Sequence, residues 1–287
     1  MTLAGYQIDF VEAGRLRLDG GAMFGIVPRP LWERRIPPDD KNRIPLAMRC
    51  LLLRGHGRTI LVDTGLGHKA DAKFEAIYGV DHAHSTLEGS LAQLGVAPED
   101  VTDVLLTHLH FDHAGGATKR TQAGDLALTF PEADHYVQAA HWRWAHESVR
   151  EEASFLAENL DPLDASGRLV LLDGEASPFE HVALHIVDGH TRGQQLPRVT
   201  DGERSVFFAA DLVPTSAHVP LLWGMAYDVE PLDTIREKER LLADAAREGW
   251  TVVFEHDSEV ATARVVETEK GFAAEDARPG WPEPDAG

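Results

Sequence analysis

The sequence predicts an α/β fold built as one domain, and three observations support this prediction. The chain has 287 residues, of which 43% are hydrophobic, so it can bury a substantial core. Short apolar runs with the pattern of β-strands recur along the chain. Segments whose apolar residues repeat at helical intervals lie between these runs. We expect residues 1–272 to form the domain and residues 273–287, which are rich in proline and acidic residues, to form a flexible tail.

The predicted elements begin with a hairpin and continue with strands that end in polar residues. Residues 6–11 and 15–19 alternate apolar and polar side chains, which predicts an opening hairpin. Residues 23–45 contain several prolines and should form a long ordered loop that either roofs a pocket or packs on the core. Further strands are predicted at 49–54, 59–62, 101–106, 134–137, 169–172, 182–187, 205–209 and 251–254, and helices at 87–94, 138–156 and 233–247.

Charge and composition argue against several classes of partner. The formal net charge of -20 disfavours nucleic-acid binding, which depends on a basic surface. Cys50 is the only cysteine, so an intramolecular disulfide is excluded. No secretion signal is recognisable, and no apolar run approaches the roughly 18 residues of a membrane helix. We therefore expect a cytoplasmic protein whose partners are a small-molecule substrate and, at most, a second copy in a homodimer, with neither nucleic acid nor membrane.

The densest group of metal-binding side chains follows the apolar run at residues 101–106. Within six residues the chain places His108, His110, Asp112 and His113. In an extended segment the first two of these point to the same face. Imidazole nitrogens and carboxylate oxygens suit zinc or a neighbouring first-row metal, and a loop at a strand end is where a rigid scaffold presents such groups. The spacing therefore predicts a metal site rather than a polar surface loop.

The motif His108-Leu109-His110-Phe111-Asp112-His113 resembles the signature of the metallo-β-lactamase fold superfamily. Later and earlier motifs resemble the rest of that pattern in order and context: Asp63-Thr64-Gly65 the early strand-end aspartate, Gly189-His190-Thr191-Arg192-Gly193 the next histidine loop, Ala210-Asp211 the bridging aspartate, and Glu255-His256 the last histidine. The resemblance covers residues 49–256. It implies an αββα sandwich of two mixed β-sheets flanked by helices, with metals at the edge of the sheets.

The resemblance also implies a ligand set for two cations. One cation would take His108, His110 and His190, the other would take Asp112, His113 and His256, and Asp211 would bridge them. The expected cofactor is two Zn²⁺, with Mn, Fe or Co as alternatives, and the nucleophile would be a hydroxide shared by the metals. Asp63 would accept a hydrogen bond from a metal-bound imidazole. The alternative for both Asp63 and Asp211 is an ordinary turn at a strand end.

With an aspartate at position 211, the sequence resembles acyl-homoserine lactonases, glyoxalase II and methyl parathion hydrolase at the bridging position. Antibiotic β-lactamases place a non-bridging residue there. RNA-processing nucleases share the aspartate, but the acidic charge disfavours that branch. We expect a dinuclear zinc hydrolase that opens a lactone or cleaves a small ester or thioester. The alternatives are phosphotriester or β-lactam hydrolysis in the same site, a mononuclear iron oxygenase, and an inactive binding module. Seven intact ligand candidates argue against the last two.

The source of transition-state stabilisation differs from one group of lactonases, which carries a tyrosine three residues after the bridging aspartate. Pro214 takes that place here. Tyr227 and His218, from the segment that follows, are the candidates for a substitute hydrogen bond, and ordinary packing is the alternative for each. Arg192 likewise replaces a proline common in the histidine loop, which should change the pocket edge and not the metals. The remaining histidines are expected to face solvent (His82, His84) or to be structural (His141, His146).

Overall fold

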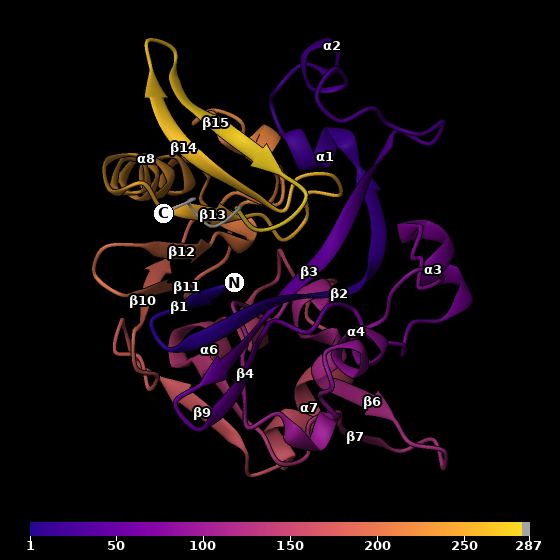
Figure 1. Cartoon of the computed structure of the whole chain (residues 1–287). Helices are drawn as coiled ribbons and strands as arrows, with labels where there is room; N and C mark the ends of the chain where they lie inside the picture. The colour runs from indigo at the N-terminus through magenta and orange to yellow at the C-terminus, as the bar shows by residue number, and fades with distance from the viewer. Residues whose placement is uncertain (283–287) are drawn as a thin grey trace.

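The computed structural model describes residues 1–282, which form two packed β-sheets (Figure 1). Over these residues the first sheet has the order β1 (Thr2–Leu3), β2 (Tyr6–Asp19), β3 (Arg43–Gly55), β4 (Arg58–Val62), β5 (Asp103–Leu105), β8 (Asp134–Gln138) and β9 (Leu169–Leu172). The second has the order β10 (Val182–Val187), β11 (Gln194–Thr200), β12 (Ser205–Phe208), β13 (Thr251–Val253), β14 (Thr262–Thr268) and β15 (Gly271–Arg278). A small separate sheet pairs β6 (Thr118–Arg120) with β7 (Leu126–Leu128).

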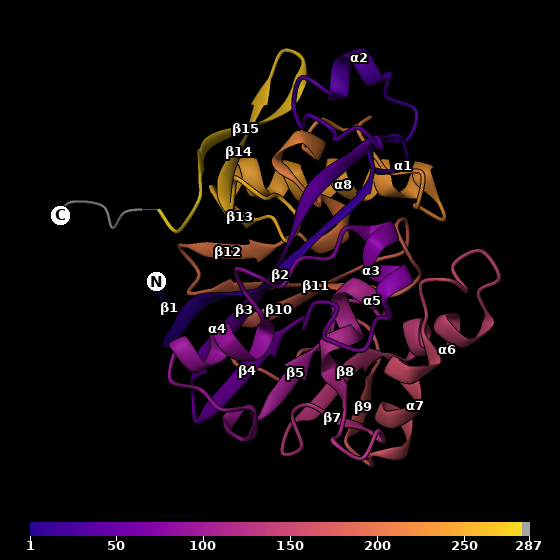
Figure 2. The ribbon, with the colours of Figure 1, turned by 90° about the vertical axis from the view of Figure 1, so that its right-hand side faces the viewer.

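Helices cover the outer faces of the sandwich. They are α1 (Gly20–Phe24), α2 (Arg29–Trp32), α3 (Ala72–Tyr78), α4 (Leu87–Gln93), α5 (Phe111–Ala114), α6 (Ala139–Glu147), α7 (Ala157–Ala165) and α8 (Pro231–Glu248). Figure 2 shows α3 to α7 gathered around the first sheet and α8 at the opposite end of the molecule, with the second sheet. The predicted αββα architecture is therefore confirmed.

Strand alternation divides the core into two layers. Leu51 and Leu53 of β3 pack against residues of the second sheet, whereas Cys50 and Leu52 of the same strand face α4 and α7. Successive side chains of a strand point to opposite faces, so a strand buried on both faces is apolar throughout. The first sheet thus lies between the second sheet on one face and helices on the other. Its strand ends can therefore meet those of the second sheet. No helix among residues 1–282 is long and apolar enough to cross a membrane.

The helix α8 shows how local signals set an element that the sequence predicted at 233–247. Pro231 occupies the first turn, where its missing N–H costs nothing, and Gly249 ends the helix in a left-handed conformation with φ 66°. Leu241 and Leu242 are buried in the core shared by the two sheets. The apolar face therefore fixes α8 on the second sheet.

The predicted opening hairpin is wrong, because residues 6–19 form one strand, β2, that pairs with β3 along its length. The register shifts between Glu12 and Arg15, beside Gly14 at φ 122°. In the sequence, the break in alternation at this point predicted a turn. In the structure it is an irregularity that bends the strand without ending it. Residues 23–45 are also more regular than predicted: they contain α2, the end of α1 and the start of β3.

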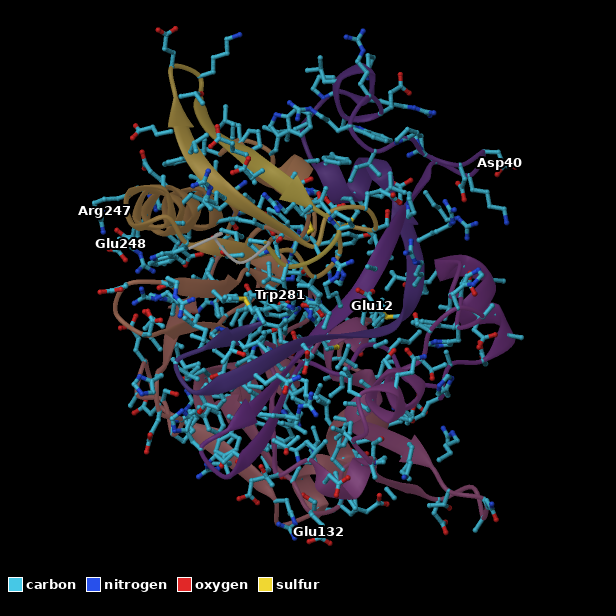
Figure 3. The ribbon with its side chains drawn as sticks, viewed as in Figure 1. Glu12, Asp40, Glu132, Arg247, Glu248 and Trp281 are labelled. Carbon is cyan, nitrogen blue, oxygen red and sulfur yellow. The ribbon has the colours of Figure 1, made fainter. Side chains whose placement is uncertain are left out.

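The predicted flexible tail from residue 273 is also wrong for most of its length. Residues 271–278 form β15, which pairs antiparallel with β14. Beyond it lies Trp281, which Figure 3 labels. Its ring stacks on that of Phe10, with the ring centroids 4.1 Å apart. The acidic, alanine-rich sequence of β15 has a low propensity for strands, so the sequence alone does not indicate one. Hydrogen bonds to the backbone of β14 hold this segment as a strand. Residues 283–287 of the predicted tail lie outside the described residues.

Candidate metal centre

The ligand candidates converge because parallel strand pairs end at the same edge in both sheets. β4 runs parallel to β5, and β12 runs parallel to β13. The first pair leads into Asp63 and the loop at 107–113, and the second pair leads into Asp211 and His256. Because the carboxyl ends of parallel strands lie side by side, side chains from four segments meet here, and His190 joins them from the loop after β10.

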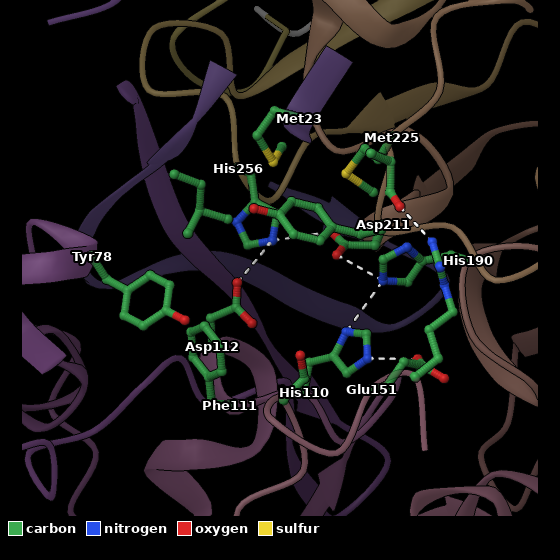
Figure 4. Close-up of a pocket in the computed structure, with 15 residues that line it drawn as sticks. Met23, Tyr78, His110, Phe111, Asp112, Glu151, His190, Asp211, Met225 and His256 are labelled. Carbon is green, nitrogen blue, oxygen red and sulfur yellow. Dashed lines mark hydrogen bonds and ion pairs between the residues drawn. The ribbon is translucent and has the colours of Figure 1, made fainter. Parts of the chain in front are cut away.

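One group of ligand atoms combines His108, His110 and His190 with Asp211. His110 Nδ1 lies 3.1 Å from His108 Nε2. It also lies 3.3 Å from His190 Nε2, which lies 3.1 Å from Asp211 Oδ2 (Figure 4). With Zn–N bonds of roughly 2.0–2.1 Å, two ligand atoms of a tetrahedral zinc are roughly 3.3 Å apart. The separations in this group match that spacing.

A second group combines Asp112, His113 and His256. The Nε2 atoms of His113 and His256 are 3.1 Å apart, and oxygens of Asp112 lie 3.9 Å and 3.8 Å from them. Asp211 serves both groups: its Oδ2 faces His190, and its Oδ1 lies 3.0 Å from His256 Nε2. Asp211 therefore lies where a bridging carboxylate would lie.

The residues present fit divalent metal binding on two observations. Asp211 Oδ1 is buried and lies close to His256 Nε2, yet it has no aligned hydrogen-bond donor. Buried polar atoms are rarely left unpaired, so this oxygen fits a role as a cation ligand. In addition, ring nitrogens 3.1 Å apart can share only one proton, whereas a cation accepts a lone pair from each ring.

The carboxylates of the centre raise the proton affinity of the imidazoles. Burial lowers the pKa of His190 and His256, but charges led by Asp211 outweigh it and raise these values to about 10 and about 9. His108 differs, because burial and neighbouring imidazoles hold its pKa well below the usual range. In the metal-free protein, protons therefore occupy positions that a cation would take.

The side-chain contacts of Asp63 go to the ligand loop and to a ligand imidazole, which agrees with a supporting role rather than with an ordinary turn. Its Oδ1 accepts from Thr107 N at 2.7 Å, and its Oδ2 accepts from Thr107 Oγ1 at 2.6 Å. The same Oδ2 lies 3.2 Å from His113 Nδ1. Asp63 adopts φ 58° and Ala210, beside Asp211, adopts φ 38°. Such left-handed conformations are uncommon for these residues and cluster at functional sites.

Three further acids support ligand imidazoles, and our reading of the sequence assigned none of them a role. Glu151 lies 2.9 Å from His110 Nε2 and Asp228 lies 3.1 Å from His190 Nδ1, whereas Glu255 lies 3.1 Å from His113 Nδ1 without an aligned hydrogen bond. Such partners fix the tautomer and orientation of a metal-binding ring. Only Glu255 had a signal, its position beside His256. His141 is structural, as predicted: its Nε2 accepts from Leu109 N inside the ligand loop.

The two candidates for a transition-state hydrogen bond differ in position. His218 is wrong for this role, because both ring nitrogens are engaged away from the cavity, with Thr215 Oγ1 at 2.7 Å and the Met23 carbonyl oxygen at 2.8 Å. Its ring also stacks on Phe24. Tyr227 lines the cavity beside the ligands, and burial raises the pKa of its hydroxyl. It therefore stays protonated and can donate.

A cavity of about 330 Å³ opens directly above the ligand atoms. Its metal-side wall includes His110, Asp112, His190, Asp211 and His256. Apolar side chains (Leu18, Met23, Phe111, Met225) with Tyr78, Tyr227 and Arg150 complete the lining. We call the part that Met225 and Tyr227 contribute the opposite wall. Figure 4 shows the Tyr78 ring beside Asp112. The cavity thus places polar ligand atoms against a largely apolar surface.

Lys238 of α8 fixes the segment that leads to this opposite wall. It is fully buried, and its ammonium group donates to the carbonyl oxygens of His218, Pro220 and Trp223 at 2.6, 3.0 and 3.0 Å. Asp228 holds the far end of the segment, since its Oδ2 accepts from Met225 N at 3.1 Å. The wall is therefore held through its backbone from both ends.

Known proteins share this sequence and fold. Residues 45–256 match the family model of the Metallo-beta-lactamase superfamily. An N-acyl homoserine lactonase of Bacillus cereus is 27% identical over 198 residues, which cover 66% of this chain and 68% of that protein. A probable metal-dependent hydrolase from Staphylococcus aureus has a crystal structure with a TM-score of 0.87 at 29% identity, covering 96% of this chain and 98% of that one.

A dizinc quorum-quenching lactonase, solved with a product homoserine, gives a TM-score of 0.80 at 18% identity and covers 100% of this chain and 97% of that one. At that identity the likeness shows a shared fold. The family model spans residues 45–256, well over half of the sequence, and its range contains every ligand candidate. The chain therefore belongs to the metallo-beta-lactamase superfamily and is one of its metal-dependent hydrolases.

Proposed function

We propose that this hydrolase binds two zinc ions and opens a lactone, or cleaves a small ester or thioester. The observation that carries the proposal is the placement of Asp211 between the two ligand groups: its Oδ2 lies 3.1 Å from His190 Nε2 and 3.5 Å from His113 Nε2, and its Oδ1 lies 3.0 Å from His256 Nε2. A relative named as an N-acyl homoserine lactonase supports the choice of a lactone. With Asp211 as a shared ligand, His108, His110 and His190 would hold one ion, and Asp112, His113 and His256 would hold the other.

Two zinc ions would supply Lewis acidity for the substrate carbonyl and lower the pKa of a water toward neutrality. The chain's own residues would do the rest. The Tyr227 hydroxyl would donate a hydrogen bond to the carbonyl oxygen as negative charge develops on it. As the oxygen of water bonds to the acyl carbon, Asp112 on the cavity wall would take the proton of that water at a carboxylate oxygen and deliver it to the alkoxide released when the acyl–oxygen bond breaks.

The cavity favours a small neutral substrate with an apolar acyl group. Its volume of about 330 Å³ is near the lower end of ligand pockets, which span roughly 300–1,000 Å³. Leu18, Met23, Phe111 and Met225 offer apolar contact to an acyl chain. Arg150 lies on the lining, but its guanidinium already donates to the Ala226 carbonyl oxygen at 2.7 Å. A short-chain acyl lactone suits this surface better than a polyanion does.

The test combines metal analysis with a substrate panel. Protein purified without added metal should contain two zinc ions per chain, whereas one iron would support an oxygenase and no metal would support a binding module. The zinc-loaded protein should hydrolyse short-chain lactones faster than thioesters, phosphotriesters or β-lactams. A clear preference for phosphotriesters or β-lactams would overturn the substrate assignment while leaving the metal assignment intact.

Two ligand variants test the assignment of separate cations. His108→Ala and Asp112→Ala should each abolish hydrolysis by removing a ligand from a different group. His84→Ala, an exposed histidine outside both groups, is the matched control and should keep full rate and metal content. Near-normal rates in both ligand variants, with unchanged metal content, would contradict the two-metal assignment.

A further inference from the structure

Three side chains able to bind a metal meet on the surface, away from the buried centre. His56 lies in the turn between β3 and β4, and Glu180 and His181 directly precede β10. One ligand atom from each residue lies within 4.8 Å of the other two. The five residues of β4 separate His56 from Asp63, which is roughly 16 Å along the strand. This surface triad therefore belongs to the opposite edge of the first sheet.

Backbone and ring contacts hold the triad in place although its members are exposed. The Tyr6 hydroxyl donates to the Glu180 carbonyl oxygen at 3.1 Å, and the Tyr6 ring lies 4.6 Å from the His56 ring. Thr200 N donates to the His181 carbonyl oxygen at 2.9 Å. Because Tyr6 is itself fully buried, it anchors the two segments to the core.

A hydrogen bond to Ala4 fixes the tautomer of His56. Its Nε2 lies 2.8 Å from the Ala4 carbonyl oxygen, which only accepts, so this nitrogen carries the proton. In a neutral ring Nδ1 then carries a lone pair, and it faces Glu180 Oε2 at 3.1 Å. Two acceptors this close require a positive charge between them, either a proton or a metal ion. Metal-binding histidines show the same arrangement, with the other ring N–H donated to a backbone carbonyl.

The donor set decides which metal would bind. Two imidazoles and one carboxylate form a known zinc ligand set that leaves a position for water, and imidazole also suits nickel and copper. The His56 and His181 rings lie 5.5 Å apart, so small side-chain movements would bring their nitrogens to one ion. The net charge of -20 raises the local concentration of cations.

We propose that His56, Glu180 and His181 bind one zinc ion, or a similar first-row divalent ion, on the surface. The ion would tie the β3–β4 turn of the first sheet to the start of β10 in the second. Binding to the native state only would stabilise the junction of the two sheets by mass action. The site lies outside the cavity, so its role is structural, and the proposal is independent of the proposed hydrolysis.

The experiment uses the full chain with its buried centre already filled, titrated with zinc chloride. One further equivalent of zinc should bind, the unfolding midpoint should rise by roughly 2–4 °C, and hydrolysis should be unchanged. His56→Ala and His181→Ala should each remove the further equivalent and the midpoint shift. His84→Ala, exposed and outside the triad, should keep both.

Nitrogen NMR of the imidazoles tests the same site without any substitution. Zinc should shift the Nδ1 resonance of His56 and leave its Nε2–H in place, because the hydrogen bond to Ala4 persists. An ion pair between imidazolium and Glu180 is the competing explanation of the 3.1 Å contact. If added zinc leaves the His56 resonances unchanged, or if the further equivalent persists in His56→Ala and His181→Ala, the proposal is overturned.

Discussion

The two walls of the cavity are built in different ways. On the metal side, each ligand ring is oriented by a side-chain or backbone partner, such as Asp228 on His190 and the Ala47 carbonyl oxygen on His256. On the opposite side, Lys238 and Asp228 hold main-chain groups of the segment that carries Met225 and Tyr227. Charged contacts therefore fix the reacting groups, and backbone contacts position the substrate-facing groups. Damage to the first wall should remove activity, and damage to the second should change how substrate binds.

The largest effect is expected at Asp211, which belongs to both ligand groups. A bridging carboxylate offsets the repulsion between two dications, so Asp211→Ala should lose one metal and cut turnover by orders of magnitude. Asp211→Asn keeps the shape but loses the charge, and it should also bind metal poorly. Metal content and lactone turnover measure both effects.

The control for Asp211 is Asp164→Asn, on an exposed position of α7, which should behave like the unmodified protein. If Asp211 were only a turn residue, Asn would preserve the turn geometry. Two tightly bound metals and full activity in Asp211→Asn would then refute the bridging role.

A smaller effect is expected at Tyr227, the residue of the opposite wall to which we assign a part in the reaction itself. Tyr227→Phe removes only the hydroxyl, so kcat should fall by roughly 10²-fold with little change in KM or metal content, as for loss of one oxyanion donor. Tyr78→Phe is the matched control, because its hydroxyl also lines the cavity. Equal, small losses in the two variants would show that neither hydroxyl stabilises the transition state.

The contrast between the walls also explains how far sequence reasoning reaches. His108 to His113 form one loop after an apolar run, so their spacing alone predicts a metal site. His190, Asp211 and His256 are single residues that only the order of a family pattern identifies. Glu151 and Asp228 give no local signal, because the fold brings each to a ligand 41 or 38 positions away. His218 lies seven residues after Asp211, but its ring points toward the Met23 carbonyl oxygen.

The raised pKa values of the ligand histidines predict two opposite trends with rising pH. The stability of the metal-free protein should fall, and the affinity for metal should rise. Charges led by Asp211 overcome burial and raise the pKa of His190 to about 10 and of His256 to about 9. Their ion pairing with Asp211 stabilises the metal-free protein fully below the unfolded pKa of roughly 6.5 and is lost as the pH rises through 9 to 10. Metal must displace these protons, so metal affinity should rise over the same range.

Unfolding midpoints of the metal-free protein from pH 6.5 to 10, with chelator competition for zinc, measure both trends. In Asp211→Asn the carboxylate that raises both pKa values is absent, so its metal-free stability should depend less on pH. A metal-free protein that becomes more stable between pH 7 and 10 would contradict this account of the centre.

The smallest effect on chemistry is expected from Lys238, which acts only on the opposite wall. Lys238→Met removes the ammonium group that pairs three buried or partly buried carbonyl oxygens, so the free energy of unfolding should fall by about 1–3 kcal/mol. Since the same carbonyls position the segment that carries Met225, which offers apolar contact to the acyl group, KM should rise several-fold. Metal content should stay unchanged, because Lys238 contacts none of the ligands.

Lys270→Met, an exposed lysine, controls for the loss of charge and should leave both stability and KM unchanged. A general loss of folding would lower active-site occupancy by metal and reduce kcat together with the unfolding midpoint. A loosened wall would instead raise KM while zinc content and kcat persist, because the metal wall is held by its own partners. If Lys238→Met lowers stability without any change in KM, the lysine supports only the fold, and the opposite wall owes its position to Asp228.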